Sequence, residues 1–381
     1  MDATKFVSPK WGRAVSTDGT YAYVRFVPTT IPRALTFEPA TINLLSEADA
    51  ALGRLSGAGR LLPNPHLLLT PFVRREALAS SRIEGTQASL SDVFEAEARG
   101  VSGSLDVREV TNYVAALDHG LARLGALPIS GRLAREMHRV LLRGVRGGER
   151  TPGEFRTSQN WIGSSDGRIE SAIYVPPTPD EIPSLLVDWE RFVHDAQPQL
   201  PLLIRTALLH YQFETIHPFL DGNGRLGRLL IVLYLVERGA LPTPLLPLSP
   251  YFERNRSSYY DCLQGVRERG DIQAWLRFFL RGVATQARDA ITRSDGLLNL
   301  RERYRLSLQG SRSRAPEVID LLLATPILTS RQVSQRLPMS TQGALNLLRQ
   351  LTAAGILRED SSGRGSLARW YADEVLELLA D

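Results

Sequence analysis

The feature that most constrains the fold of this chain is an apolar run that directly follows a polar, glycine-rich stretch. Residues 229–236 read LLIVLYLV and would place apolar side chains on every face of a helix. A helix of that kind has to be buried in a core. Gly239 follows at the point where a helix end favours a residue that accepts the left-handed conformation. The sequence therefore predicts a buried central helix that ends near residue 239.

The stretch that leads into this helix gathers polar groups around its first turn. Residues 217–228 read HPFLDGNGRLGR. The first turn of a helix has unpaired backbone N–H groups and a partial positive charge, and glycines let another group approach them closely. Arg225 and Arg228 add two full charges about one turn apart. These features predict a binding site for a phosphate chain.

Two further side chains in this stretch suit chemistry on a phosphate. Asp221 is the residue type that holds Mg²⁺ between phosphates. His217 is the titratable group nearby that suits proton transfer near neutral pH. The stretch thus offers a candidate base, a candidate metal ligand and a candidate anion site in one loop.

The same residues also satisfy the dinucleotide-binding pattern G-x-G-x-x-G. That pattern needs a strand before it and an acidic residue about 20 positions further on. Residues 202–211 read LLIRTALLHY, which predicts a helix, and no acidic residue occurs from Arg238 to Phe252. A dinucleotide-binding fold is therefore disfavoured. A purely structural loop is disfavoured too, because it does not need two arginines that enter an apolar helix.

Residues 217–228 match the pattern H-x-F-x-[DE]-G-N-G-R-x-x-R at every specified position, and the stretch resembles the signature of the Fic (Fido) family. The resemblance implies an enzyme that transfers AMP from ATP to a Ser, Thr or Tyr hydroxyl of a target protein, or of itself. ATP is then the substrate and Mg²⁺ the cofactor. The resemblance also implies the roles of the individual residues: His217 as the catalytic base, Asp221 as the Mg²⁺ ligand, and Gly222, Asn223, Gly224, Arg225, Leu226, Gly227 and Arg228 as the nucleotide-binding residues.

A second motif lies upstream. Residues 71–85 read PFVRREALASSRIEG and predict a helix that Gly85 ends. Ser80 and Glu84 are four positions apart and share a face. A carboxylate near a helix C-terminus has the wrong sign for the helix dipole, so Glu84 calls for a nearby cation.

The pattern S-x-x-x-E-G resembles the inhibitory motif [ST]-x-x-x-E-[GN] of the Fic family, in the subclass with an N-terminal inhibitory helix. The resemblance implies that Glu84 pairs with Arg228 and occupies space that the γ-phosphate of ATP needs. It also implies that Glu84 can orient a water molecule that removes AMP from a modified protein. An ordinary helix end is the alternative.

Residues 161–177 predict a β-hairpin, with a turn at 164–167 and a second strand at 169–175 that two prolines end. In Fic enzymes a hairpin at this location, the flap, positions the target protein by taking it up as an extra strand. The resemblance assigns this role to Ala172, Ile173, Tyr174 and Val175. A purely structural hairpin is the alternative.

The C-terminal region predicts a helix–turn–helix followed by a β-hairpin, with helices at 316–324, 331–337 and 341–354 and strands at 356–359 and 367–371. This order resembles a winged helix. The residues expected to face DNA are Thr341, Gln342, Asn346 and Arg349 on the second helix of the motif, and Arg364 at the wing tip. Modules of this kind also serve as protein or dimer contacts, so DNA binding and a homodimer both stay open.

Other candidate residues carry weaker patterns. Residues 251–260 predict the start of a helix on which the family often places a nucleoside contact, with Asn255 and Tyr259 as candidates and core packing as the alternative for the tyrosine. His119 and His138 fall on core-facing helices and are interpreted as structural histidines.

The predicted fold class is mostly α, with a Fic-fold helical core, a small β-hairpin flap and a C-terminal winged helix-turn-helix domain. The N-terminal region predicts a short strand at 21–27 and a helix at 44–55. The predicted segments are an N-terminal arm (1–65), a helical region (66–125) with the inhibitory helix at 72–84, the catalytic core (126–288), a linker helix (289–315) and the winged-helix domain (316–381).

Composition sets wider limits. The single cysteine, Cys262, excludes an internal disulfide and fits a reducing cytoplasm. No apolar run reaches the 18 or so residues of a membrane helix, so a cytoplasmic protein without a membrane partner is expected. The net charge of +4 is too weak to imply DNA binding by itself. A second hypothesis is a nucleotide-responsive, DNA-binding transcriptional regulator that acts through the C-terminal module and depends little on His217.

Overall fold

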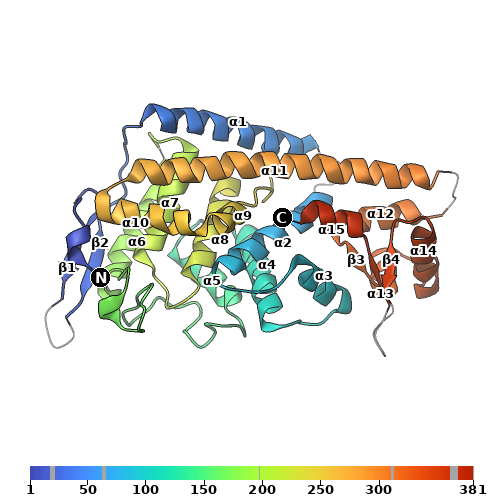
Figure 1. Cartoon of the computed structure of the whole chain (residues 1–381), viewed down its shortest axis with the longest axis horizontal. Helices are drawn as coiled ribbons and strands as arrows, with labels where there is room; N and C mark the ends of the chain where they lie inside the picture. The colour runs from blue at the N-terminus through green and yellow to red at the C-terminus, as the bar shows by residue number, and fades with distance from the viewer. Residues whose placement is uncertain (18–21, 62–65, 197, 310–312, 361–367, 381) are drawn as a thin grey trace. The chain divides into compact units, whose positions relative to one another are not determined.

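The computed structural model describes the whole chain except residues 18–21, 62–65, 197, 310–312, 361–367 and 381 (Figure 1). The chain divides into two compact units. Unit 1 consists of residues 1–53, 112–240 and 251–285, and unit 2 consists of residues 54–111, 241–250 and 286–381. None of the described helices is both long enough and apolar enough to cross a membrane.

Unit 1 is mainly helical. Its elements are β1 (Gly12–Ser16), β2 (Val24–Pro28), the start of α1 (Pro39–Leu61), the end of α4 (Leu105–Arg123), α5 (Gly131–Leu141), α6 (Ile182–Val193), α7 (Leu202–Ile216), α8 (Asn223–Glu237), most of α9 (Ser249–Arg254), α10 (Arg256–Arg269) and the start of α11 (Ile272–Ser307). Short 3-10 turns are η1 (Ala3–Lys5), η2 (Ile169–Ser171) and η3 (Pro179–Glu181).

Helix α8 is the predicted buried helix, and it lies in the core of unit 1. Every residue from Leu226 to Leu235 is buried, and Gly239 follows in the left-handed conformation, with φ +70°. Helix α7 packs along α8 and is buried from Leu203 to Ile216. The prediction of a buried helix closed by Gly239 is confirmed.

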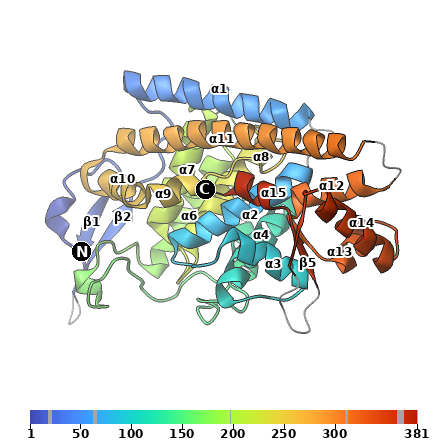
Figure 2. The same cartoon turned by 45° about the vertical axis from the view of Figure 1, so that its right-hand side comes forward.

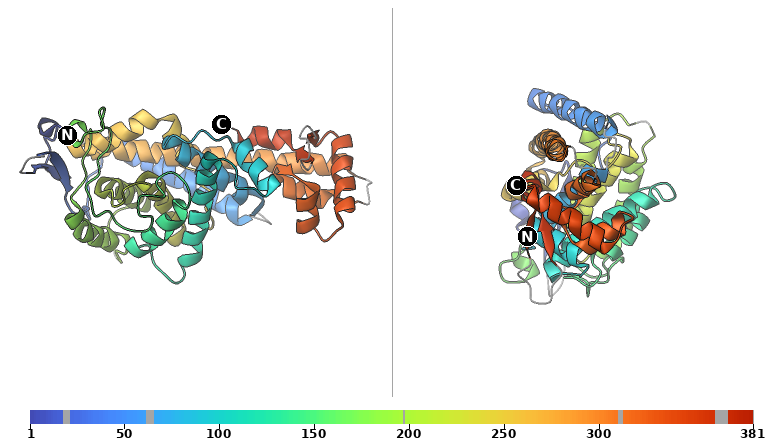
Figure 3. Two further views of the ribbon diagram at one scale, coloured as in Figure 1. Left: turned by 90° about the horizontal axis from the view of Figure 1, so that it is seen from below. Right: turned by 90° about the vertical axis from the view of Figure 1, so that its right-hand side faces the viewer.

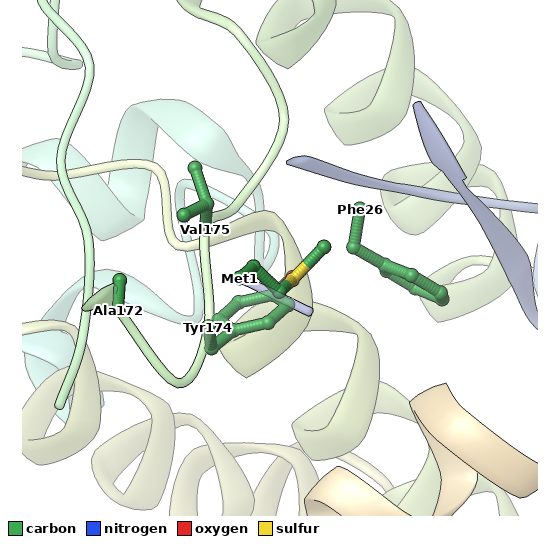
Figure 4. Close-up of a cluster of buried hydrophobic side chains, with 5 residues drawn as sticks. All are labelled: Met1, Phe26, Ala172, Tyr174 and Val175. Carbon is green, nitrogen blue, oxygen red and sulfur yellow. The ribbon is translucent and has the colours of Figure 1, made fainter. Parts of the chain in front are cut away.

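The N-terminal strands form an antiparallel hairpin in which Gly12 lies opposite Pro28 and Ser16 opposite Val24. The predicted strand at 21–27 corresponds to β2, although Tyr21 lies outside the described residues. Strand β1 was not predicted. The hairpin contributes to a buried apolar cluster, and Figure 4 shows these side chains together: Met1, Phe26, Ala172, Tyr174 and Val175.

The predicted strand at 169–175 is wrong. Residues 169–171 form the 3-10 turn η2, and the pairing of the hairpin is reduced to one antiparallel bridge between Ile162 and Tyr174. In this bridge the Ile162 N–H donates to the Tyr174 carbonyl (2.9 Å). The Asp166 carboxylate accepts from the Arg168 N–H (3.0 Å) and from two serine hydroxyls. These bonds curl the segment into a turn, which competes with an extended strand.

Unit 2 contains the C-terminal module together with upstream helices. Its elements are the end of α1, α2 (His66–Ile83), α3 (Leu90–Arg99), the start of α4, the start of α9, the end of α11, α12 (Ala315–Ala324), β3 (Ile327–Leu328), α13 (Ser330–Arg336), α14 (Thr341–Ala353), β4 (Arg358–Asp360), β5 (Arg369–Tyr371) and α15 (Asp373–Leu379). The three strands form an antiparallel sheet in the order β3-β5-β4.

The winged helix-turn-helix prediction is confirmed. Helices α13 and α14 pack against each other beside the small sheet (Figure 2). Strand β3 and helix α15 were not predicted, because two and seven residues are too short to show a period. Arg364, the expected wing-tip residue, lies outside the described residues.

The C-terminal module shares its packing with the upstream helices of unit 2. Helix α2 packs against α12 and α15, and α3 packs against β3. The Arg369 guanidinium donates to the Glu95 carboxylate of α3 (2.8 Å), and the Tyr371 hydroxyl donates to the same carboxylate (3.1 Å). The Gln332 side chain donates to the Glu97 carbonyl (3.1 Å). The module and the helix that carries Ser80 thus belong to one packed body.

Two helix boundaries differ from expectation. Helix α2 begins at His66, before the predicted start at residue 72, and includes Pro71. Helix α11 runs without interruption from Ile272 to Ser307 (Figure 3), whereas the sequence suggested a core that ends at residue 288 and a separate linker helix from residue 289. Neither a proline nor a left-handed glycine breaks it.

A buried histidine of α7 makes the stability of unit 1 depend on pH. Nε2 of His210 lies 2.7 Å from the Tyr259 hydroxyl, and the ring stacks among Phe252 and Trp275. Burial, with a smaller effect of Arg228, lowers the pKa of His210 to about 3. In the unfolded chain a histidine titrates near 6.5. The stabilisation is therefore fully present above pH 6.5 and is lost as the pH falls towards 3, because only the unfolded state gains a proton.

We expect the melting temperature to fall between pH 6.5 and 4.5, and to fall less in His210→Phe, which removes a contribution of about 1.4 kcal/mol per pH unit. Thermal unfolding measured across this range tests the expectation. His119→Phe is the control, since that imidazole is 34% exposed and pairs with Glu136. If the melting temperature of His210→Phe fell as much over this pH range as that of the parent protein, a neutral, buried His210 would be contradicted.

Candidate functional site

His217 is the residue at which α7 ends. Its backbone lies in the left-handed region, with φ +51° and ψ +59°, which is strained for a residue with a side chain. Its N–H donates to the Phe213 carbonyl (2.9 Å) and closes the helix. Nδ1 lies 3.4 Å from the Glu214 carbonyl. With the proton assigned to Nδ1 by this contact, Nε2 is the basic nitrogen.

The turn between His217 and α8 is held by the side chain of Asn223. Its Oδ1 accepts from the Phe219 N–H (2.9 Å), and its Nδ2 donates to the Phe219 carbonyl (2.8 Å). Gly222 caps α8 at φ +75°. Asn223 is expected to bind the nucleotide, and these bonds give its buried amide a role in shaping the loop.

His138 of α5 supports the same turn from outside. Its Nε2–H donates to the Asp221 carbonyl (2.9 Å), and its Nδ1 accepts from the Gly153 N–H (2.8 Å). The ring stacks on Phe219 at 3.9 Å. Burial lowers the pKa of His138 to about 4, so the imidazole is neutral at pH 7. The interpretation of His138 as a structural histidine is confirmed.

The carboxylate of Asp221 is partly open to solvent. Its side chain is 45% exposed, and Oδ1 accepts from the Gly222 N–H and lies 3.6 Å from Arg225 Nη2. Gly147, at φ +81°, lies against it, since a Cβ there would stand 2.6 Å from Oδ2. Mg²⁺ is commonly held by one or two carboxylates together with substrate phosphates and water. The exposed Asp221 fits that donor set, and among the described residues no group of three or more His, Cys, Asp or Glu forms a separate metal site.

The two arginines of the stretch are buried near the N-terminal end of α8. Arg225 is 3% exposed and Arg228 is 2% exposed, and both lie in the first two turns of the helix. The N–H groups and the dipole of that helix end favour a negative charge. Buried guanidinium groups need anionic neighbours, and Asp221 supplies one to Arg225. The arrangement suits the phosphates of a nucleotide. Gly224 and Leu226 lie in the same first turns, half-buried and buried respectively.

The two candidates on the later helices are placed differently. Tyr259 is buried, its ring stacks on Phe252 at 4.7 Å, and its hydroxyl contacts His210. This placement favours core packing. Asn255 is half-buried between α9 and α10, and its side chain donates to the Tyr251 carbonyl (2.9 Å).

Ser80 and Glu84 lie in unit 2, at the end of α2. Ser80 is buried, whereas Glu84 is exposed and directly follows the last residue of the helix. The turn after it is firmly held. The Thr86 hydroxyl donates to the Glu109 carboxylate, and the Arg82 guanidinium donates to the Ala88 carbonyl (2.9 Å). The exposed carboxylate is therefore presented on a fixed support.

The four predicted flap residues share one anchored segment of unit 1. The Tyr174 hydroxyl donates to the Thr215 carbonyl, and the Arg267 guanidinium lies 3.8 Å from the centre of its ring. Burial raises the pKa of Tyr174. The Val175 carbonyl accepts from the Phe26 N–H (2.9 Å). Strand β2 therefore already bonds to the backbone edge of the flap segment at Val175.

The side chains of the segment divide into buried and exposed ones. Ala172, Tyr174 and Val175 are buried, whereas Ile173 is 62% exposed. Trp161 and Ile162 on the facing segment are exposed as well. A partner would therefore meet an apolar side chain on a segment that is already ordered.

Sequence reasoning missed two residues that hold the signature loop. The Asn160 side chain donates to the Phe219 carbonyl (2.9 Å), and Arg156 bonds to backbone carbonyls around His217. Both lie in a segment without periodicity. Residues 156–160 read RTSQN, so the two side chains stand in a run of polar residues that does not identify their partners.

Three family models match the chain in order. Residues 42–122 match the model described as Fic/DOC family N-terminal, residues 128–235 match Fic/DOC family, and residues 315–371 match HTH DNA binding domain. The chain therefore contains regions that match the two parts of the Fic/DOC family, followed by a region that matches a helix-turn-helix domain.

Curated relatives match about a third of the chain. The protein adenylyltransferases Fic of Aedes aegypti and Drosophila melanogaster are each 35% identical to it over 127 residues, which is 33% of this chain. The matched stretch spans only 22% and 23% of these two relatives.

Solved structures confirm the fold. A Fic family protein from Desulfovibrio desulfuricans aligns with a TM-score of 0.58 at 23% identity and covers 89% of this chain and 97% of that chain. A Fic-1 fragment from C. elegans aligns with a TM-score of 0.50 at 21% identity and covers 66% of this chain and 72% of that chain.

Gly227 determines how closely α7 and α8 approach each other. A Cβ at this position would stand 2.5 Å from Glu214 Oε1 and 3.3 Å from His210 Nδ1. We expect Gly227→Ala to destabilise unit 1 by about 1–3 kcal/mol, the usual cost of overpacking a core. Unfolding in denaturant measures this change in the free energy of unfolding.

Gly53→Ala in α1 is the matched control, because a Cβ added there would meet no atom within 4 Å and a helical alanine is favoured over glycine. Equal stability changes in both variants would contradict the importance of this close approach.

Proposed function

We propose that the protein transfers AMP from ATP to a Ser, Thr or Tyr hydroxyl of a target protein, or of itself. One observation carries the proposal. A strained histidine, a half-exposed aspartate and two buried arginines come together where α7 ends and α8 begins. The name of the curated relatives, protein adenylyltransferase, agrees with it.

In the proposed mechanism the phosphates of ATP lie over the first turn of α8. Backbone N–H groups of the turn 222–227 and the Arg225 guanidinium hold them, and Arg228 takes the γ-phosphate. Asp221 would hold Mg²⁺, and the ion would supply positive charge that neutralises the phosphates. The flap segment presents the acceptor hydroxyl to the imidazole.

The transfer itself breaks a phosphoanhydride bond of ATP and forms a phosphoester bond to the acceptor oxygen. Nε2 of His217 accepts the hydroxyl proton while the hydroxyl oxygen attacks the α-phosphorus in line. The bond from the α-phosphorus to the bridging oxygen breaks, and pyrophosphate leaves with the electron pair. Arg225 and the helix N-terminus stabilise the charge that develops on the transferring group.

Glu84 restrains this reaction in the proposal. A carboxylate that pairs with Arg228 removes the cation that the γ-phosphate needs. The exposed position of Glu84 on a fixed turn, and the buried charge of Arg228, support such a pairing chemically. The same carboxylate can orient a water molecule for the removal of AMP.

We expect labelled AMP from α-labelled ATP to appear weakly on protein with the parent chain and more strongly with Glu84→Gly, by about 5- to 150-fold, the range of a 1–3 kcal/mol coupling. His217→Ala in the Glu84→Gly background should lose about 10²–10⁴-fold, the usual contribution of a general base. Label on the protein itself and on proteins of a lysate is measured.

Gln87→Gly removes another exposed side chain from the same turn and is the matched control. A rise in this variant equal to that in Glu84→Gly would point to a general loosening of the turn. An absence of label in every variant, with or without Mg²⁺, would overturn the proposed transfer.

A second candidate function is DNA binding through the C-terminal module. Thr341, Gln342, Asn346 and Arg349 are all exposed on α14, as expected for a recognition helix. Glutamine and asparagine suit adenine, and arginine suits guanine, in the major groove. Because the module packs on α2 and α3, the whole chain is the right sample for the test.

We expect the full chain to select a specific site from random duplex DNA at physiological salt, and Arg349→Ala to weaken that site by about 1–3 kcal/mol, the usual value of one base contact. Fluorescence anisotropy measures both. Arg303→Ala, which removes an exposed arginine of unit 2 outside α14, is the control. Binding that is equally strong for every sequence would contradict base recognition.

A further inference from the structure

We infer that Arg156 is the positioning residue that fixes the base His217 relative to the flap segment. The inference rests on the proposed function, because it explains how the acceptor hydroxyl and the base are brought into register. It starts from the bonds of one buried side chain, which is 2% exposed and lies outside both recognised motifs.

Arg156 donates to three consecutive backbone carbonyls at the end of α7. Its own N–H donates to the Pro218 carbonyl (2.9 Å), and Nε donates to the His217 carbonyl (2.9 Å). Nη2 also lies 3.4 Å from the Ile216 carbonyl. The last carbonyls of a helix lack partners within the helix, so these donors satisfy groups that would otherwise need water.

The position of these bonds matters because His217 is strained. Its left-handed backbone persists only where surrounding contacts over-determine it. The bond to the Phe213 carbonyl fixes its N–H, and Arg156 fixes its carbonyl. The peptide groups on both sides of the imidazole are thus held, and the direction of the side chain follows from them.

The same guanidinium reaches the flap segment. Nη2 donates to the Pro177 carbonyl, two residues after Val175. The neighbouring Gln159 side chain donates to the Pro176 carbonyl (3.0 Å). Segment 156–160 therefore bonds to the loop that carries the base and to the end of the flap segment, which sets the spacing between them.

A lysine at position 156 cannot form the same set of bonds to several backbone carbonyls. A guanidinium is planar and has donors on several edges, whereas an ammonium is a single point with a flexible stem. Burial lowers the pKa of Arg156 to about 10, so the group keeps its charge at neutral pH. Charged donors to carbonyls give stronger bonds than neutral ones.

The test uses the Glu84→Gly chain, where transfer is expected to be strongest. Arg156→Lys should lower kcat by about 10²-fold, since a misplacement of about 1 Å can have that effect. Binding of ATP, measured by calorimetry, should change less than about 3-fold. The KM for ATP should change as little, because α8 holds the phosphates.

Arg205→Lys is the matched control. Arg205 is also a buried arginine of unit 1, and it donates to the Phe192 carbonyl (2.9 Å) and the Val193 carbonyl (3.3 Å) at the end of α6. A comparable fall in kcat for Arg205→Lys, or an unchanged kcat for Arg156→Lys, would overturn the positioning role.

A second readout does not depend on activity. In a chain with ¹⁵N-labelled histidine, the signal that disappears in His217→Ala identifies His217. Arg156→Lys should shift that signal and leave those of His119 and His194 unchanged, whereas Arg205→Lys should leave the His217 signal in place. If the His217 signal does not shift in Arg156→Lys, the inference is refuted. If the signal shifts but no variant transfers AMP, the proposed function fails and the positioning contact stands.

Discussion

The packing of α7 against α8 is the contact on which the candidate site depends. Both helices are buried over most of their length, and the short turn 217–222 joins the C-terminal end of one to the N-terminal end of the other. The negative end of one helix dipole therefore lies next to the positive end of the other along the chain. A base at the first end and an anion site at the second follow from the same short turn, and Gly227 permits the close approach that holds them together.

Much of this arrangement could be predicted from the sequence because it is local. The buried helix, its closing glycine and the helix-turn-helix all show in residues that are near one another in the chain. The supports of the site are not local. Arg156 bonds to residues 60 and 61 positions away and His138 to a carbonyl 83 positions away, and no local pattern identifies these partners. The prediction of a strand at 169–175 failed for a different, local reason, since the side chain of Asp166 offers the backbone a competing turn.

The N-terminal residues also make contacts that the sequence did not predict, because their partners are distant in the chain. They carried no functional pattern in the sequence, yet β2 donates to the Val175 carbonyl and Phe26 packs with Tyr174 in the apolar cluster of Figure 4. The flap segment is thus ordered by side chains that come from both ends of unit 1. An ordered segment loses less conformational entropy when a partner binds, which favours recognition through few contacts.

Helix α2 belongs to two features that were predicted separately from the sequence, the inhibitory motif and the helix-turn-helix module. It ends at the exposed Glu84, and it also packs against α12 of the helix-turn-helix module. In many multidomain proteins such modules are joined by linkers and can be exchanged between chains in evolution. In this chain the module cannot be exchanged alone, because α12 packs against α2 and Arg369 forms an ion pair with Glu95 of α3. Substitutions in the α12 face and in α2 are therefore expected to be inherited together, so that the two segments co-vary among descendants of this sequence.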